Sequence, residues 1–200
     1  MSEGLKWSVV GVGVLLASAC LSVAGKPSPE SESALAAAPQ PPPEMAALYP
    51  RIGTWKVVIR TQPSESSPKG GVDEGVMVMK KGPGGYSIVQ EFSSQGSSGN
   101  IVGQSYAWWD AKAKQYKSVW CDNLQGCVEF TTAVSGKSWS VELDGEAGGK
   151  KVHTVIRATM SADNNTIHEE ASSSYDGGPA RTEAVSEYKR VADGAVSDKP

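Results

Sequence analysis

Short runs of alternating apolar and polar residues recur along most of this 200-residue chain and constrain its fold more than any other feature. Alternation with a period of two is typical of β-strands, whose successive side chains point to opposite faces. Turn residues separate the runs at spacings of roughly 8 to 14 residues, and no segment has a convincing helical period. The runs occupy residues 55–60, 75–80, 86–93, 101–109, 115–121, 127–134, 138–143, 152–160, 166–174 and 181–191.

Even spacing and short loops favour an up-and-down sheet over folds with long crossover connections. A meander of about eight to ten strands curls, and closing it removes its exposed edges. We therefore expect an all-β fold, an antiparallel up-and-down β-barrel of about 8–10 strands. A two-sheet sandwich is the structural alternative. A barrel of this size is either filled by its own side chains or encloses one small ligand.

The N-terminal 45 residues have the composition of a leader and a linker. Residues 7–19 are mostly apolar but too few to span a bilayer, which takes about 20, and Ala17-Ser18-Ala19 resembles a cleavage site. We expect a signal peptide over 1–19; an uncleaved anchor or a buried helix is the alternative. Proline-rich residues 20–45 predict an extended linker. The barrel domain is expected over 46–192, followed by a disordered tail over 193–200.

Cys20 follows the small residues of the leader directly. This arrangement resembles the lipobox of bacterial lipoproteins, although Ala17 occupies the position that usually holds Leu. Either Cys20 is lipidated or the leader undergoes ordinary cleavage. In both cases we expect an extracytoplasmic protein, either periplasmic or anchored to the cell envelope, and we expect contact with the membrane only if a lipid anchor is present.

Cys121 and Cys127 flank a five-residue stretch that reads as the end of a hairpin. Facing arms of a hairpin bring Cα atoms within disulfide range, and an exported chain meets an oxidising compartment. The pair therefore predicts a disulfide, with two reduced thiols as the alternative. No further Cys or His cluster completes four metal ligands, so no metal site is expected.

Aromatic residues are densest between positions 106 and 139. Alternation places Trp108 and Trp109 on opposite faces, whereas Tyr116 and Trp120 share one face. Such residues either line a pocket for an apolar or planar ligand or simply pack the core. Our candidate ligand-binding residues are Tyr106, Trp108, Tyr116 and Trp120.

Few residues suggest more specific chemistry. His153 and His168 are the only histidines, and one that pointed into the barrel could ligate haem; a surface position is the simpler reading. Charges within or beside the strands would contact a polar ligand if they faced inward, but solvated outer faces explain them more simply. These charges are Glu91, Asp122, Arg157 and Glu169.

The sequence contains no arrangement typical of catalysis. No Ser-His-Asp order, phosphate loop or paired carboxylates stand out, and the basic residues are scattered in a chain of net charge −3. We therefore predict no catalytic residues, no cofactor and no nucleic-acid partner, and an enzyme is the less favoured class. The oligomeric state is left open.

Two patterns resemble known proteins. Gly53-Thr54-Trp55 in the first run, with Arg190 in the last, resembles the lipocalin closure, in which the Trp packs at the barrel base and the Arg lies across it. The second pattern is similar to a bacterial lipocalin-like family known only as a domain of unknown function. It consists of Gly85-Tyr86-x-Ile88-Val89-Gln90-Glu91-Phe92, Trp109-Asp110, Tyr116-x-x-x-Trp120-x-Asp122 and Glu187-Tyr188-Lys189-Arg190.

The resemblance covers about residues 48 to 192 and implies a lipocalin-like β-barrel without an established activity. It assigns Trp55 and Arg190 to barrel closure, and the Cys121 and Cys127 pair departs from its pattern. We expect an exported barrel that binds a small apolar or amphipathic ligand. A solid structural or interaction domain is the alternative, and a haem-binding barrel is a third reading.

Overall fold

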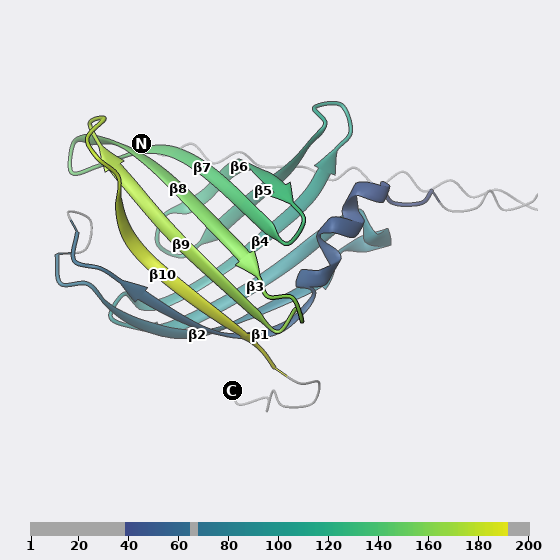
Figure 1. The fold of residues 1–200 in the computed structure, drawn as a ribbon, viewed down its shortest axis with the longest axis horizontal. Helices are drawn as coiled ribbons and strands as arrows, with labels where there is room; N and C mark the ends of the chain where they lie inside the picture. Colours follow the sequence, from purple (N-terminus) through teal and green to yellow (C-terminus); the bar gives the residue numbers. More distant parts are fainter. Residues whose placement is uncertain (1–38, 65–67, 192–200) are drawn as a thin grey trace, which may run out of the picture. The chain divides into compact units, whose positions relative to one another are not determined.

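Ten antiparallel strands, joined in chain order by hairpins, close into a barrel in the computed structural model of the protein (Figure 1). The structure describes residues 39–64 and 68–191; the expected signal peptide, Cys20, most of the linker and the tail over 193–200 lie outside them. The strands are β1 (Gly53–Thr61), β2 (Gly71–Lys81), β3 (Ser87–Gly96), β4 (Gly99–Asp110), β5 (Gln115–Asp122), β6 (Gly126–Ser135), β7 (Ser138–Ala147), β8 (Lys150–Met160), β9 (Thr166–Tyr175) and β10 (Arg181–Arg190).

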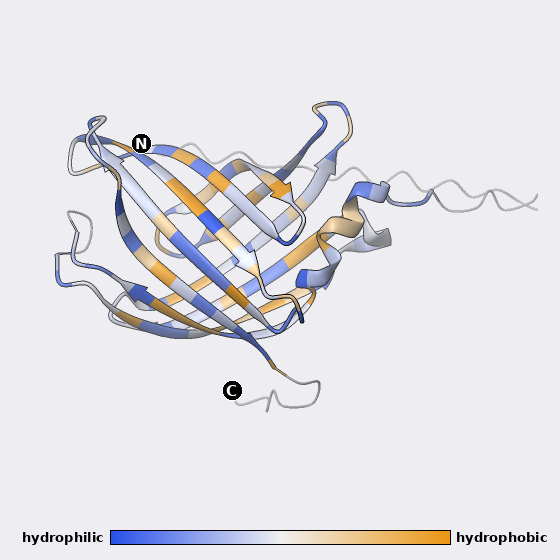
Figure 2. Ribbon diagram, viewed as in Figure 1, coloured by the Kyte–Doolittle hydropathy of each residue, from blue (hydrophilic) through white to orange (hydrophobic). Residues whose placement is uncertain are grey.

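The expected up-and-down barrel is confirmed. Each strand pairs with its neighbours in sequence, and β10 returns to pair with β1. The alternative of two packed sheets is wrong, since the described strands form one closed sheet. Along the strands, apolar and polar residues alternate as the two faces of a barrel wall require (Figure 2).

Several strands are longer than the sequence indicated. Residues outside the expected strand runs, at 71–74, 94–96 and 145–147, continue the ladders. Ser98 lies in the turn between β3 and β4. Its backbone N–H (2.9 Å) and its hydroxyl (2.8 Å) both donate hydrogen bonds to the buried carboxylate of Asp73 on β2. These bonds order a turn that its Gly- and Ser-rich composition alone would predict to be an irregular loop.

The expected linker over 20–45 is wrong at its C-terminal end. Two short 3₁₀ helices, η1 (Pro43–Ala47) and η2 (Tyr49–Arg51), precede β1, and Met45 and Leu48 are fully buried. Proline is compatible with the first positions of a helical turn because its missing N–H would have no partner there. In Figure 1 these turns lie across one end of the barrel. No helix in the described part of the chain has the length and apolar character needed to cross a membrane.

The apolar core lies at the end of the barrel that the 3₁₀ turns cover. Besides Met45 and Leu48 of the 3₁₀ turns, its members come mainly from the starts of odd-numbered strands and the ends of even-numbered strands, which meet at one end of an up-and-down barrel. They include Met45, Leu48, Trp55, Met79, Ile88, Met160, Ile167 and Tyr188. This end is therefore filled, and any interior space lies further along the barrel axis.

Arg190 lies across the Trp55 ring, 4.1 Å from its centroid, opposite it in the β1–β10 ladder. The guanidinium donates from Nη1 to the Ile52 carbonyl (2.5 Å) and from Nη2 to the Pro50 carbonyl (2.7 Å). Gly53 makes room for it, because a Cβ there would lie 2.3 Å from Nη1, and its φ of +138° also favours glycine. The Gly53-Thr54-Trp55 pattern thus allows Arg190 of the last strand to pack against the start of the first strand.

The Cys121–Cys127 disulfide links β5 to β6 at directly opposed positions. The predicted pairing is present in the structure. By the chain-entropy account, closing a loop this short stabilises the fold by about 2 kcal/mol. The disulfide fixes the hairpin that forms one wall of the open end of the barrel.

We expect Arg190→Lys to lower the free energy of unfolding by about 1–3 kcal/mol, because lysine keeps the charge but cannot form the same fork of hydrogen bonds. Urea denaturation measures the change. Arg181→Lys, at the exposed start of the same strand, is the control and should stay within about 0.5 kcal/mol. Equal stability of the two variants would contradict the closure role of Arg190.

Candidate functional site

A cavity of about 330 Å³ occupies the barrel interior beyond the core. Most of its wall is apolar, and it includes Phe92, Trp120, Phe130, Val141, Leu143 and Ile156. A small number of polar groups join them, which is the usual character of a small-molecule site. The interior is therefore filled at one end and open in the middle.

Small inward-facing residues explain the open space. Ser105 and Ala107 on β4, Ser118 on β5, Thr132 on β6 and Ser186 on β10 line the cavity, where larger side chains would fill it. The Ser118 and Thr132 hydroxyls lie 3.5 Å apart. The Ser105 hydroxyl is buried and has no hydrogen-bond partner among the described residues. A buried hydroxyl without a partner is costly, so this position suits a polar group of a bound molecule or a water.

Arg51 places a positive charge at the end of the cavity that adjoins the apolar core. The side chain is only 9% exposed, and its guanidinium lies 3.9 Å from the centre of the Trp139 ring. Trp55 fixes the backbone at this point by donating from Nε1 to the Arg51 carbonyl (2.9 Å). Burial lowers the pKa of the guanidinium to about 10, which leaves it charged at neutral pH. Sequence reasoning missed this residue, since nothing in its local pattern distinguishes it from a surface arginine.

Glu169 and Tyr188 form a second polar group in the wall. The Tyr188 hydroxyl donates to Glu169 Oε1 at 3.0 Å. Burial raises the pKa of the Glu169 carboxyl, partly offset by this hydrogen bond and by the Arg51 charge. Burial also raises the pKa of Tyr188 well above its usual value. An outer position for Glu169 was the simpler expectation from the sequence; the structure places it inside because it shares a face of β9 with buried Ile167.

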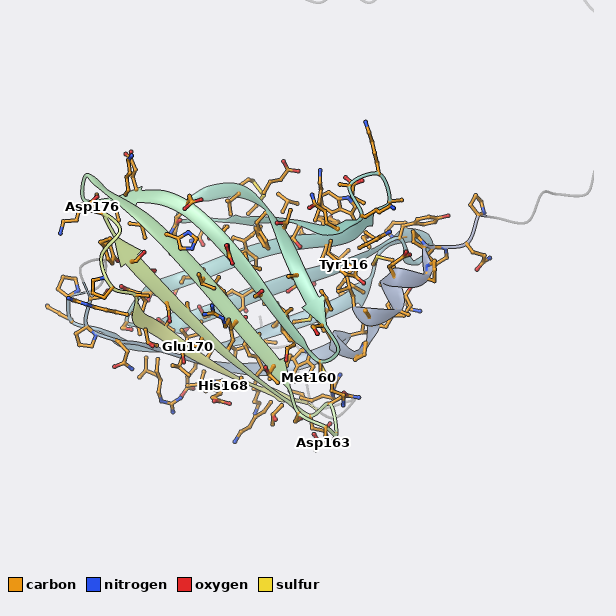
Figure 3. All side chains as sticks on the ribbon, turned by 45° about the horizontal axis from the view of Figure 1, so that its top comes forward. Tyr116, Met160, Asp163, His168, Glu170 and Asp176 are labelled. Atoms are coloured by element: carbon orange, nitrogen blue, oxygen red, sulfur yellow. A yellow bond between two sulfur atoms is a disulfide. The ribbon has the colours of Figure 1, made fainter. Side chains whose placement is uncertain are left out.

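Tyr116 and Trp120 both line the cavity, as their shared face of β5 implied. Tyr116 lies beside the 3₁₀ turns (Figure 3), and its hydroxyl donates to the Glu44 carbonyl at 2.8 Å. Trp120 lies further along the strand, with its Nε1 donating to Asp122 at 2.7 Å. Gly103 on β4 admits the Trp120 ring, because a Cβ there would lie 2.4 Å from it.

The other two candidate residues, Tyr106 and Trp108, do not line the cavity. Alternate residues of β4 point inward, and the inward positions are those of Ser105 and Ala107. Tyr106 is 42% exposed on the outer face. Trp109, whose parity is opposite to Trp108, packs against the core, and its ring lies 4.9 Å from that of Tyr116. Alternation separated the two tryptophans correctly, but the choice of Trp108 as the inward one was wrong.

Neither histidine points into the barrel. His153 Nδ1 lies 2.9 Å from Asp144, His168 Nδ1 lies 2.5 Å from Glu187, and both imidazoles are about half exposed. Figure 3 marks His168 and Glu170 along β9. The interpretation of an inward haem-ligating histidine is therefore wrong. Within residues 39–64 and 68–191, no group of three or more His, Cys, Asp or Glu side chains could hold a metal ion.

The other charges named from the sequence lie outside the cavity. Glu91 pairs with Lys80 across the β2–β3 ladder at 3.0 Å, and Arg157 is exposed. Asp122 accepts hydrogen bonds from the backbone N–H groups of Leu124 (2.8 Å) and Gln125 (2.7 Å) in the β5–β6 turn. These three residues therefore lie on the outer face of the barrel or in its turns, as the sequence predicted for solvated charges.

The wall opens between β6 and β7. These strands pair only where residues Thr132–Ser135 meet residues Ser138–Val141, and the first half of β6 has no partner in β7. Residues Gly126–Glu129 are exposed on both faces, including Val128, which lines the cavity and is 44% exposed. The cavity thus reaches the surface beside Val128 and Leu143.

No protein-family model matches the chain, and no curated protein matches it. Among solved structures, the barrel is similar to Rv2717c from M. tuberculosis, with a TM-score of 0.52 and 16% identity over 76% of this chain and 100% of that one. It also resembles the S-type phycobiliprotein lyase CPES from Guillardia theta, with a TM-score of 0.47 and 9% identity over 74% and 93% of the two chains. The likeness to Rv2717c shows the fold alone, which is consistent with a lipocalin-like all-β barrel.

We expect the stability of the wild type to fall relative to Glu169→Gln as pH rises. Because the folded-state pKa of Glu169 is raised, its contribution is fully present below the ordinary glutamate pKa of about 4.3 and is lost as pH rises through the raised value. Glutamine has no proton to lose. Urea denaturation of both proteins at about pH 4 and about pH 8 measures the change. A pH-independent difference between them would contradict the raised pKa.

Proposed function

We propose that the barrel binds a small amphipathic molecule in its interior. The cavity of about 330 Å³ is the observation that carries this proposal. It falls at the lower end of the range for ligand pockets, about 300–1,000 Å³. A barrel that served only as a solid structural domain would have no reason to keep serine, alanine and threonine at its central inward positions.

The volume limits the size of the ligand. An apolar cavity of roughly 150 Å³ accommodates benzene. The space here is about twice as large, so it suits a body of roughly a dozen heavy atoms. Its wall of aromatic and aliphatic side chains favours an apolar body, and the polar groups around Arg51, Ser105 and Glu169 favour a molecule with a polar end.

Decanol, a neutral amphiphile of about this size, tests the proposal. We expect saturable binding to the wild type in isothermal titration calorimetry and a loss of at least tenfold in affinity in Ala107→Phe, whose ring would occupy the cavity. Tyr106→Phe, one residue away on the outer face, should bind as the wild type does. Absence of saturable binding, or equal binding by Ala107→Phe, would contradict the proposal.

We further propose that the protein is exported and anchored to the cell envelope through Cys20. The disulfide in the described part of the chain supports an oxidising compartment. The apolar leader and the small residues before Cys20 support export and lipidation. A tether of about 20 residues would then separate the lipid from the barrel.

Labelling the bacterial host with a palmitate analogue tests the anchor. The analogue should mark the wild-type protein, whereas Cys20→Ser should remain exported and unlabelled. Cys121→Ser is the matched control and should keep the label, because that cysteine belongs to the disulfide. An unlabelled wild-type protein would show ordinary cleavage of the leader instead.

A further inference from the structure

We propose that the ligand carries a single carboxylate, bound by Arg51, with its apolar body extending toward the opening between β6 and β7. This inference rests on the interior binding proposed above and adds the chemical class and orientation of the ligand. It assigns Arg51 the role of recognising the anionic end.

The Arg51 guanidinium is a buried charge without an anionic partner in the described part of the chain. Arg51 is buried and lines the cavity, yet no carboxylate among the described residues lies within salt-bridge distance of it, and its side chain has no hydrogen-bond partner there. A buried arginine is normally paired, because an unpaired buried charge is costly. The stacking on Trp139 orients the plane of the guanidinium but uses none of its N–H donors. Those donors remain available to an anion in the cavity.

The groups around Arg51 leave its positive charge in excess at this end of the cavity. The titratable groups that face Arg51 are Glu169 on β9, Tyr188 on β10 and Tyr116 on β5. Burial raises the pKa of all three, so it favours their neutral forms. The Glu169 carboxyl also receives the Tyr188 hydrogen bond, which directs it along the wall. Arg51 therefore supplies a net positive charge at this end of the cavity.

One positive charge favours a monoanion. A phosphate monoester carries close to two negative charges at neutral pH, so one of them would be left without a cation beside Arg51. A carboxylate carries one charge, and its two oxygens fit the planar fork of a guanidinium. The geometry therefore points to a carboxylic acid.

The polarity of the cavity changes along its length. Tyr116 and Trp139 lie where the 3₁₀ turns cover the barrel, whereas Trp120 lies four residues further along β5 and Val128 is its partner on β6. Four residues of a strand span roughly 13 Å. The wall at the far end is apolar, and it is there that the cavity reaches the surface. An apolar chain bound by its acid end at Arg51 would thus point toward the opening.

Decanoate, decanol and methyl decanoate separate the charge from the apolar body. At pH 7.5 we expect the wild type to bind decanoate at least tenfold more tightly than either neutral analogue, as a charge-assisted hydrogen bond predicts. Calorimetry gives the affinities, and the part of the change in tryptophan fluorescence that is lost in Trp139→Phe reports occupancy of this end, because Trp139 contacts Arg51. Arg51→Met should lose the preference for decanoate while still binding decanol.

Arg157→Met removes an exposed arginine on the outer face of β8 and should keep the preference. Arg51→Lys retains the charge without the fork and should keep part of it; this variant also serves if Arg51→Met does not fold. Equal affinity of the wild type for decanoate and decanol would overturn the carboxylate assignment while leaving interior binding intact. A preference that survives at the full wild-type ratio in folded Arg51→Met would assign Arg51 a purely structural role, and one that survives at that ratio in Arg51→Lys would overturn recognition by the guanidinium fork. Failure of all three compounds to bind would overturn interior binding itself.

Discussion

The indole of Trp55 connects the closure of the barrel to the candidate site. One face of the ring receives the Arg190 guanidinium, which joins the last strand to the first. Its N–H donates to the Arg51 carbonyl and so fixes the short turn that carries Arg51. Arg190 contributes to the same turn through its bonds to the Pro50 and Ile52 carbonyls. The position of the buried positive charge therefore depends on the contacts that close the sheet.

The uneven filling of the barrel follows from where the large side chains lie. Buried tryptophan, methionine and isoleucine residues such as Trp55, Met79 and Ile88 gather at the end covered by the 3₁₀ turns. Small hydroxyl-bearing residues occupy the inward positions further along. One end can thus stabilise the fold while the other keeps space for a ligand. A filled core and an interior cavity, which the sequence posed as alternatives, thus occur in the same barrel.

The fold could be predicted from the sequence because it depends on short-range patterns. Alternation located the strands and placed Trp55, Val57 and Ile59 on one face, and the Cys121 and Cys127 spacing identified a hairpin. The strand ends were underestimated where Gly and Ser continue a ladder, since their order comes from a partner such as Asp73 and not from their own preferences. The linker was extended too far because the burial of Met45 depends on the barrel it covers.

The site was only partly predictable. Parity identified Tyr116 and Trp120 as neighbours, yet it could not say which face of β4 was the inner one, and so Trp108 was chosen. For Glu169, the shared face with Ile167 was available in the sequence, but the usual exposure of glutamate argued against it. Arg51 gave no local signal, because its burial results from packing between distant parts of the chain. A buried charge of this kind is a property of the fold and becomes apparent only in three dimensions.

A crystal structure of the protein grown with decanoate brominated at its methyl end tests the central claim most directly. The account predicts an anomalous bromine peak inside the barrel near Trp120 and Val128, with the carboxylate on the Arg51 guanidinium. Bromine found only on the outer surface, with the interior closed by side chains or holding water alone, would contradict it.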